Sequence, residues 1–152
     1  MADVPKRLLV LDTSVLLVLG GARSRHPDAV QRITNLFKER GPDSFAITAP
    51  GLAEAHGLPV PEGLLVLDMN AHAARIAAGL GAAWRARAKK SGARGLNPYL
   101  VKADWMILGT AEAWKATALY TEDDQMRVMA QTAGLKLDVR DLPPVPKQPK
   151  LI

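Results

Sequence analysis

The stretch LLVLDTSVLLVL, residues 8–19, decides the fold class of this chain. Four apolar residues, Leu8–Leu11, run directly into Asp12, and a second apolar segment begins at Val15. A short, continuous apolar run is typical of a strand that is buried on both faces, as in a parallel sheet. Ligands of open α/β sheets bind outside the carboxyl ends of the strands, so Asp12 stands where a functional site would lie.

The rest of the chain alternates predicted strands with predicted helices. Further apolar strands are predicted at residues 45–48, 64–67, 118–121 and 135–139. Helical spacing, capping residues and Gly or Pro stop signals predict helices over residues 28–40, 50–56, 101–115 and 123–133. One more helix is predicted to begin after Asn70 and to end before a loop over residues 89–98. This alternation predicts an α/β fold, in which a five-stranded parallel sheet carries helices on both faces.

Length and composition indicate one globular domain. The 152 residues are 48% hydrophobic and 23% charged, which are ordinary values for such a domain. We assign residues 1–142 to this domain and residues 143–152, which are rich in proline, to an extended tail. The chain has no cysteine, which excludes disulfides, zinc-thiolate sites and thiol nucleophiles and fits a cytoplasmic location. Asp12 interrupts the first apolar run too early for a signal peptide or a membrane span.

Three further acidic residues are predicted to lie near Asp12. Asp123 follows the strand at 118–121 just as Asp12 follows the first strand, and Glu54 follows the second strand on the first turns of its helix. Asp104 shares the apolar stripe of its helix with Leu108 and Ala111, so its carboxylate is expected to be partly buried. The carboxyl ends of parallel strands lie on one edge of the sheet, which brings these acids together.

Several carboxylates can share one site only with raised pKa values or with a bound cation. Thiols are absent and histidines are few, so an all-oxygen site for Mg²⁺ or Mn²⁺ is the cofactor that this pattern predicts. Such ions lower the pKa of a bound water and stabilise charge during phosphate displacement. The alternative is structural: Asp12 and Asp123 would only cap helices, and Asp104 would only pair with a lysine.

The motifs that carry these acids resemble those of PIN-domain ribonucleases. They are LLVLDTSVLL, then TAPGLAEAHGL with Glu54, then VKADWMILGTAEAW with Asp104, then ALYTEDDQMRVMAQTAGL with Asp123. The resemblance covers about residues 7–142 and implies a metal-dependent endoribonuclease with an acidic pocket for Mg²⁺ or Mn²⁺. It implies that Asp12, Glu54, Asp104 and Asp123 are the catalytic and metal-binding residues.

The resemblance also assigns two hydroxyl positions, since Ser14 and Thr121 match residues that brace the pocket. Asp124 stands beside Asp123 and is a second candidate ligand, although the Thr-x-Asp spacing favours Asp123. The chain departs from the family after its third acid, where a small apolar run is replaced by the bulkier residues 105–109. This change is expected to alter helix packing rather than metal binding.

A basic stretch suggests where a polyanion would bind. The net charge is +5, and residues 69–103 contain seven Lys or Arg residues and no acid. We predict RNA phosphate contacts along it, from Arg85, Arg87, Lys89, Lys90 and Arg94. The alternative is a solvated helix end, since cations favour helix C-termini. Arg23 and Arg25, in the loop after the first strand, are further candidates.

Several functions are compatible with this pattern. Many small single-domain PIN proteins are toxins of type II toxin–antitoxin pairs, which implies an antitoxin protein and a homodimer as partners beside the RNA substrate. A PIN nuclease in RNA processing and a non-catalytic module that binds RNA or protein are the alternatives. A phosphohydrolase with Asp12 as nucleophile is disfavoured because Ser14 occupies the position of its second acid. A response-regulator receiver is disfavoured because too little chain follows the acidic segment at 121–130.

Overall fold

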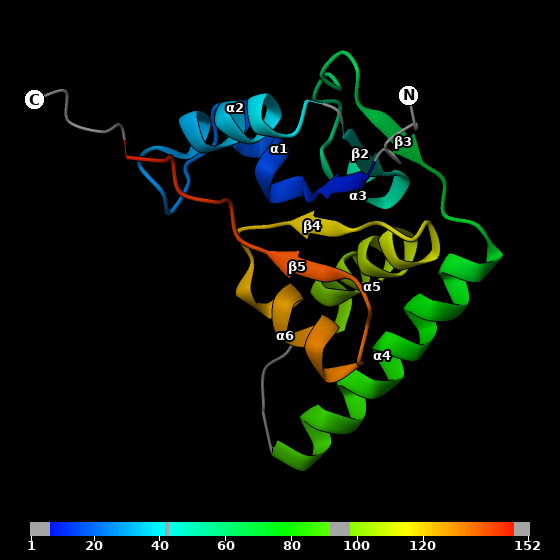
Figure 1. Cartoon of the computed structure of the whole chain (residues 1–152). Helices are drawn as coiled ribbons and strands as arrows, with labels where there is room; N and C mark the ends of the chain where they lie inside the picture. Colours follow the sequence, from blue (N-terminus) through cyan, green and yellow to red (C-terminus); the bar gives the residue numbers. More distant parts are fainter. Residues whose placement is uncertain (1–6, 42, 92–97, 148–152) are drawn as a thin grey trace, which may run out of the picture.

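The computed structural model describes residues 7–41, 43–91 and 98–147 and forms one parallel sheet with helices on both faces (Figure 1). Its strand order is β3-β2-β1-β4-β5. The strands are β1 (Leu8–Leu11), β2 (Ser44–Thr48), β3 (Leu65–Leu67), β4 (Ala118–Tyr120) and β5 (Asp138–Arg140). The helices of the described residues are α1 (Thr13–Leu19), α2 (Ala29–Glu39), α3 (Ala49–Glu54), α4 (Ala71–Ser91), α5 (Pro98–Ala113) and α6 (Asp124–Thr132). The predicted α/β class and its five-stranded parallel sheet are confirmed.

Alternation along the central strands divides the core between the two faces of the sheet. Leu9 and Leu11 of β1 belong to the core under α1 and α2, whereas Val10 belongs to the core under α4, α5 and α6. All three side chains are almost completely buried. Side chains of a strand point alternately to opposite faces, so a strand covered on both sides has to be apolar throughout. This is why residues 8–11 are an uninterrupted apolar run.

Helices α4 and α5 pack unusually close together, because glycines stand at their contact points. A Cβ on Gly109 would lie 2.8 Å from the Ala73 carbonyl oxygen, and a Cβ on Gly81 would lie 2.8 Å from the Trp105 ring. Trp105 is the first of the bulky residues that depart from the PIN pattern, and it is buried here. The expected change in helix packing is thus accommodated by Gly81, on the neighbouring helix.

Two predicted boundaries are wrong. The loop predicted over residues 89–98 begins too early and ends too late, because α4 continues to Ser91 and α5 begins at Pro98; residues 92–97 lie outside the described part. Pro98 fits there because the first residues of a helix need no N–H partner. The last strand is three residues long rather than five. The Glu112 carboxylate accepts hydrogen bonds from the backbone N–H groups of Lys136 and Leu137, so these residues are held outside the sheet.

The chain leaves the sheet after β5 without forming another element in the described residues. Leu142 is buried beside α2, and its carbonyl oxygen accepts a hydrogen bond of 3.2 Å from Arg32. Residues 141–147 form neither helix nor strand. The division of the chain at residue 142 stays a prediction. No helix in the described part of the chain is both long enough and apolar enough to span a membrane.

Candidate functional site

Asp12 is held at the carboxyl end of β1 by two hydroxyl groups. Its backbone N–H donates to the Tyr120 carbonyl oxygen at 2.9 Å, which extends the pairing of β1 with β4 by one residue. The Thr121 hydroxyl donates to Asp12 Oδ2 at 2.7 Å, and the Ser14 hydroxyl donates to the same oxygen at 2.9 Å. Ser14 and Thr121, which the resemblance assigned to bracing the pocket, both contact this carboxylate. Its orientation is therefore fixed from both neighbouring segments.

The carboxylate of Asp12 does not cap the helix that follows it. Asp12 occupies the N-cap position of α1, but its side chain makes no capping hydrogen bond. Only 5% of the residue is exposed, and no salt bridge within the described residues includes it. Burial raises its pKa, and the charge of Asp123 raises it further against the lowering effect of its hydrogen bonds. A buried acid without a cation is costly, so the helix-cap explanation does not account for Asp12.

Glu54 approaches the same edge from the end of α3. Thr48, at the end of β2, caps α3 by accepting a hydrogen bond from the Gly51 N–H at 3.1 Å, which starts the helix directly at the sheet edge. The Thr13 hydroxyl donates to the Gly51 carbonyl oxygen at 3.2 Å and so ties α3 to α1. Burial raises the pKa of Glu54; a hydrogen bond with Thr13 lowers it, and the charge of Asp12 raises it. Glu54 and Asp12 thus lie close enough to repel each other.

Asp104 faces the edge from α5. Its predicted partial burial is confirmed, and its stripe neighbours Leu108 and Ala111 are completely buried. Burial, together with the charges of Asp12, Asp123 and Glu54, raises the pKa of Asp104 to about 7. Each of these acids comes from a different segment of the chain. These effects are the electrostatic sign that Asp104 lies near the other three predicted acids.

The neighbours Asp123 and Asp124 point to different surroundings. The Asp123 carboxylate accepts a hydrogen bond of 2.8 Å from the Gln125 N–H and raises the pKa of both Asp12 and Asp104. Asp124 instead pairs with Arg25 at 3.0 Å and with Arg127 at 2.7 Å. Asp123 is the N-cap of α6, whereas Asp124 is the first residue of the helix and its side chain is 68% exposed.

The chemistry of this edge suits a hard divalent cation. Among the described residues, no salt bridge includes any of the four predicted acids; Asp12 accepts hydrogen bonds from two hydroxyls, and Asp123 accepts one from a backbone N–H. As the side chains stand, no three His, Asp or Glu residues of the described ranges are grouped so as to hold one ion. Mg²⁺ usually keeps several waters and binds through one or two carboxylates, so the donor set fits Mg²⁺ or Mn²⁺ without such a cage.

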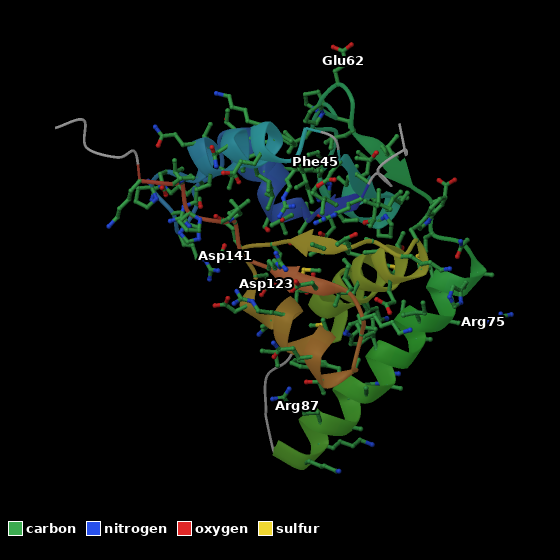
Figure 2. The ribbon with its side chains drawn as sticks, in the orientation of Figure 1. Phe45, Glu62, Arg75, Arg87, Asp123 and Asp141 are labelled. Carbon is green, nitrogen blue, oxygen red and sulfur yellow. The ribbon has the colours of Figure 1, made fainter. Side chains whose placement is uncertain are left out.

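Four of the five predicted RNA-contact residues lie on the last turns of α4, away from the four acids in sequence. The Arg85 guanidinium lies 5.6 Å from the ring centre of Trp105, and that of Arg87 lies 5.7 Å from the ring centre of Trp84. Arg87 also donates to the Thr132 hydroxyl at the end of α6. Lys89 and Lys90 are exposed in the last turn, and Arg94 lies outside the described residues. Figure 2 shows Arg87 at this end of α4, apart from Asp123 and Asp141.

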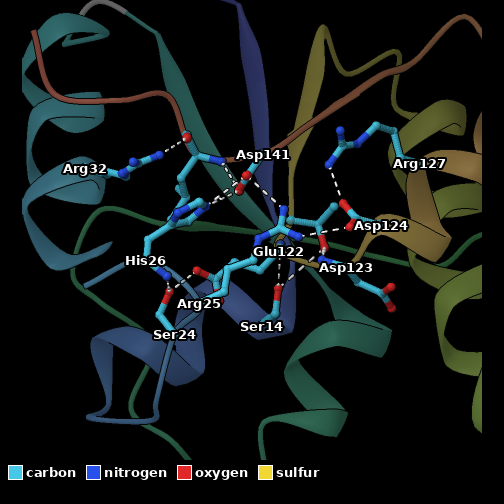
Figure 3. A network of polar contacts seen from close by, with 12 residues as sticks. Ser14, Ser24, Arg25, His26, Arg32, Glu122, Asp123, Asp124, Arg127 and Asp141 are labelled. Carbon is cyan, nitrogen blue, oxygen red and sulfur yellow. Dashed lines mark hydrogen bonds and ion pairs between the residues drawn. The ribbon is translucent and has the colours of Figure 1, made fainter. Parts of the chain in front are cut away.

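Sequence reasoning missed the residues that surround the acids from the loop after α1. Arg25 and His26 both pair with Asp141, at 2.8 Å and 2.9 Å, and Figure 3 shows them beside the start of α6. Arg25 was predicted to contact phosphate, but its guanidinium is engaged by two carboxylates. Asp141 directly follows β5, so its position after a strand was a usable signal. Nothing in the sequence pairs it with a loop more than a hundred residues earlier.

Comparison with known proteins adds no family to this description. No protein-family model matches the chain, and no curated protein matches it. The class is therefore defined by the fold: a parallel α/β domain whose strand order is compatible with PIN-like and Rossmann-like folds.

Proposed function

We propose that this protein is a metal-dependent endoribonuclease of the PIN type that hydrolyses RNA phosphodiester bonds. One observation carries the proposal: Asp12, Glu54 and Asp104 come from separate segments at the carboxyl edge of the sheet, and the pKa of each is raised by burial and by the charge of at least one other predicted acid, Asp123 among them. Keeping repelling acids together without a salt bridge reduces stability, and this cost is relieved when a cation binds. The strand order and the motifs around each acid agree with this function.

The four acids would hold Mg²⁺ or Mn²⁺. When bound, such an ion supplies a water of lowered pKa and positive charge near the phosphate that is attacked. The residues of the chain orient the site: hydroxyls of Ser14 and Thr121 fix Asp12, and Thr13 links α1 to α3 beside Glu54. The pKa of Asp104 is raised to about 7, so near neutral pH this carboxyl must lose a proton before it can bind a cation.

The experiment is cleavage of a single-stranded RNA by the purified chain with Mg²⁺, with Mn²⁺ and with excess chelator. Wild type should cleave only with a divalent cation. Asp12→Asn should lose at least about 100-fold in rate, the upper range for disturbing a metal's surroundings. Asp138→Asn is a matched control, because Asp138 lies at an exposed sheet edge and pairs with Arg140. It should cleave at the wild-type rate.

Two results would contradict this function. If wild type binds RNA but never cleaves it in either metal, the chain is a binding module. If Asp12→Asn cleaves as fast as wild type, the activity does not come from this edge. Asp12→Asn is also melted: if its melting temperature equals that of wild type, any loss of activity is not caused by unfolding.

The biological role that we propose is that of the toxin in a type II toxin–antitoxin pair, acting as a homodimer with an antitoxin partner. This part of the proposal rests on the motif resemblance alone. Expression of the chain should arrest growth, Asp12→Asn should not, and co-expression of a small neighbouring gene should relieve the arrest. Normal growth at high levels of active enzyme would instead favour RNA processing.

A further inference from the structure

The loop after α1 contacts acids on both sides of Asp123. The Ser24 hydroxyl donates to Glu122, and Arg25 Nη1 donates to Asp124 Oδ2 at 3.0 Å. Ser24 is in turn fixed by the loop itself, because its oxygen accepts the His26 backbone N–H at 3.0 Å. Figure 3 shows these contacts running from the loop to the turn between β4 and α6.

The same loop also holds the acid that follows β5. Arg25 Nη2 lies 2.8 Å from Asp141 Oδ2, and His26 Nε2 lies 3.0 Å and 2.9 Å from the two Asp141 oxygens. Burial raises the pKa of Asp141, but its hydrogen bonds with His26, the Leu142 N–H and Arg25 outweigh this effect and leave it below its usual value. A single guanidinium therefore joins the first residue of α6 to the residue that follows β5.

We propose that residues 24–26, which we call the clamp, bind some acids of this edge and so determine which of them are available to a metal ion. Arg25 is the positioning residue of this metal site. The clamp binds Glu122, Asp124 and Asp141, whereas none of its three residues binds the Asp123 carboxylate, which accepts the Gln125 N–H at 2.8 Å. This inference rests on the proposed function, because the clamp positions acids of the same proposed metal site.

These contacts determine the positions of the carboxylates rather than the folding stability of the protein. Arg25 and Asp124 are 38% and 68% exposed, and ion pairs with such exposure contribute on the order of 0–1 kcal/mol. Their orientational effect is larger, because Asp123 and Asp124 are adjacent and compete to face one cation. Without Arg25, Asp124 would keep its pair with Arg127 and Asp141 would keep its contacts with His26 and the Leu142 N–H, so both carboxylates would be held less firmly and could compete for a bound ion.

The test is the Mn²⁺ affinity of the purified chain, measured by calorimetry, together with its rate of RNA cleavage. Arg25→Ala should weaken Mn²⁺ binding about 10- to 100-fold, the usual effect of removing a residue that orients metal ligands. Arg25→Lys keeps the charge but loses the planar fork that spans two carboxylates, so its affinity should also fall. The double variant Arg25→Ala/Asp124→Asn should recover most of the loss, because the competing charge is gone.

Arg23→Ala is the matched control. Arg23 is exposed in the same loop and carries the same charge, but none of the ion pairs among the described residues includes it. Its loss should leave Mn²⁺ affinity unchanged. Equal losses in Arg23→Ala and Arg25→Ala would show a general charge effect and overturn the clamp.

The clamp and the proposed function fail in different ways. If wild type binds no Mn²⁺ and cleaves no RNA, the proposed function is wrong. If wild type binds Mn²⁺ and Arg25→Ala binds it equally well, the function stands and the clamp is overturned. A double variant that recovers nothing would also overturn the clamp, since removal of Asp124 would then relieve no competition.

Discussion

The acidic edge of the sheet and the basic end of α4 carry opposite charges and are built in opposite ways. The edge joins Asp12, Glu54, Asp104 and Asp123 from four separate segments, and the charges of neighbouring acids raise the pKa values of the first three. The basic end is local: its described members lie within residues 85–90 on one helix and are exposed. At the edge the charges repel one another in a partly buried place, whereas on α4 each charge is solvated or rests on an indole ring.

This contrast predicts how each region responds to substitution. Coupled groups that act on one ligand are strongly non-additive, so losing one acid should cost nearly as much as losing several. Separate phosphate contacts contribute through counterion release, and each adds a similar increment. The edge should therefore respond in an all-or-none manner and the basic end in a graded manner.

The largest expected effect separates the two adjacent aspartates. Asp123→Asn should abolish RNA cleavage, at least about 100-fold, because it removes a carboxylate coupled to Asp12 and Asp104. Asp124→Asn should retain activity within the range of the wild type, since its carboxylate already pairs with Arg127 and Arg25. Both variants are assayed with Mn²⁺ and melted to confirm folding. Loss of activity in Asp124→Asn with full activity in Asp123→Asn would reverse the assignment.

The next effect concerns the basic end of α4. Replacing Arg85, Arg87, Lys89 and Lys90 together by Ala should weaken RNA binding for all sequences alike. Each lost contact should flatten the plot of log affinity against log salt concentration by about 0.7 for single-stranded RNA. Fluorescence anisotropy at several salt concentrations measures this slope, and Lys38→Ala/Lys115→Ala serves as a control for loss of charge elsewhere. An unchanged slope would mean that these residues are only a solvated helix end.

Asp104 gives the edge a smaller effect, which depends on pH. Burial and the neighbouring acids raise its folded pKa from 3.8 to about 7, so the metal-free folded state holds a proton that the unfolded state has released. Stability without metal should therefore fall as pH rises from about 4 to about 7, by up to about 1.4 kcal/mol per unit, and level off above 7. Asp104→Asn should remove most of this slope, as measured by urea unfolding at pH 5, 6, 7 and 8. An identical slope in Asp104→Asn would show that Asp104 is not the titrating group.

The fold was predictable because its signals are local. Residues 8–11 form an uninterrupted apolar run because both faces of the sheet are covered, and the order of strands and helices followed from similar runs. The convergence of the acids was predictable from topology, since each acid follows a strand or lies on an apolar stripe. The start of the last strand was not predictable, because it depends on tertiary hydrogen bonds that the backbone N–H groups of Lys136 and Leu137 donate to the Glu112 carboxylate.

The contacts of Arg25 could not be predicted from the sequence either, because they too depend on tertiary structure. A guanidinium in a loop reads as a surface charge unless the neighbouring strand ends are known. Here the guanidinium of Arg25 pairs with Asp124 and Asp141, which lie about a hundred residues further along the chain. Spacing patterns carry no information about such a pairing.

The most direct test of the metal site is a Mn²⁺ titration of the purified chain at pH 8, followed by calorimetry and by thermal melting. We expect wild type to bind Mn²⁺ saturably and to melt at a higher temperature with Mn²⁺ than without it. Asp12→Asn/Asp104→Asn should lose both effects. The double variant should itself melt at least as high as metal-free wild type, because it lacks two repelling charges. Wild type that binds no Mn²⁺ at millimolar concentration, or a double variant that binds it as tightly as wild type, would contradict the claim that these four carboxylates form a metal site.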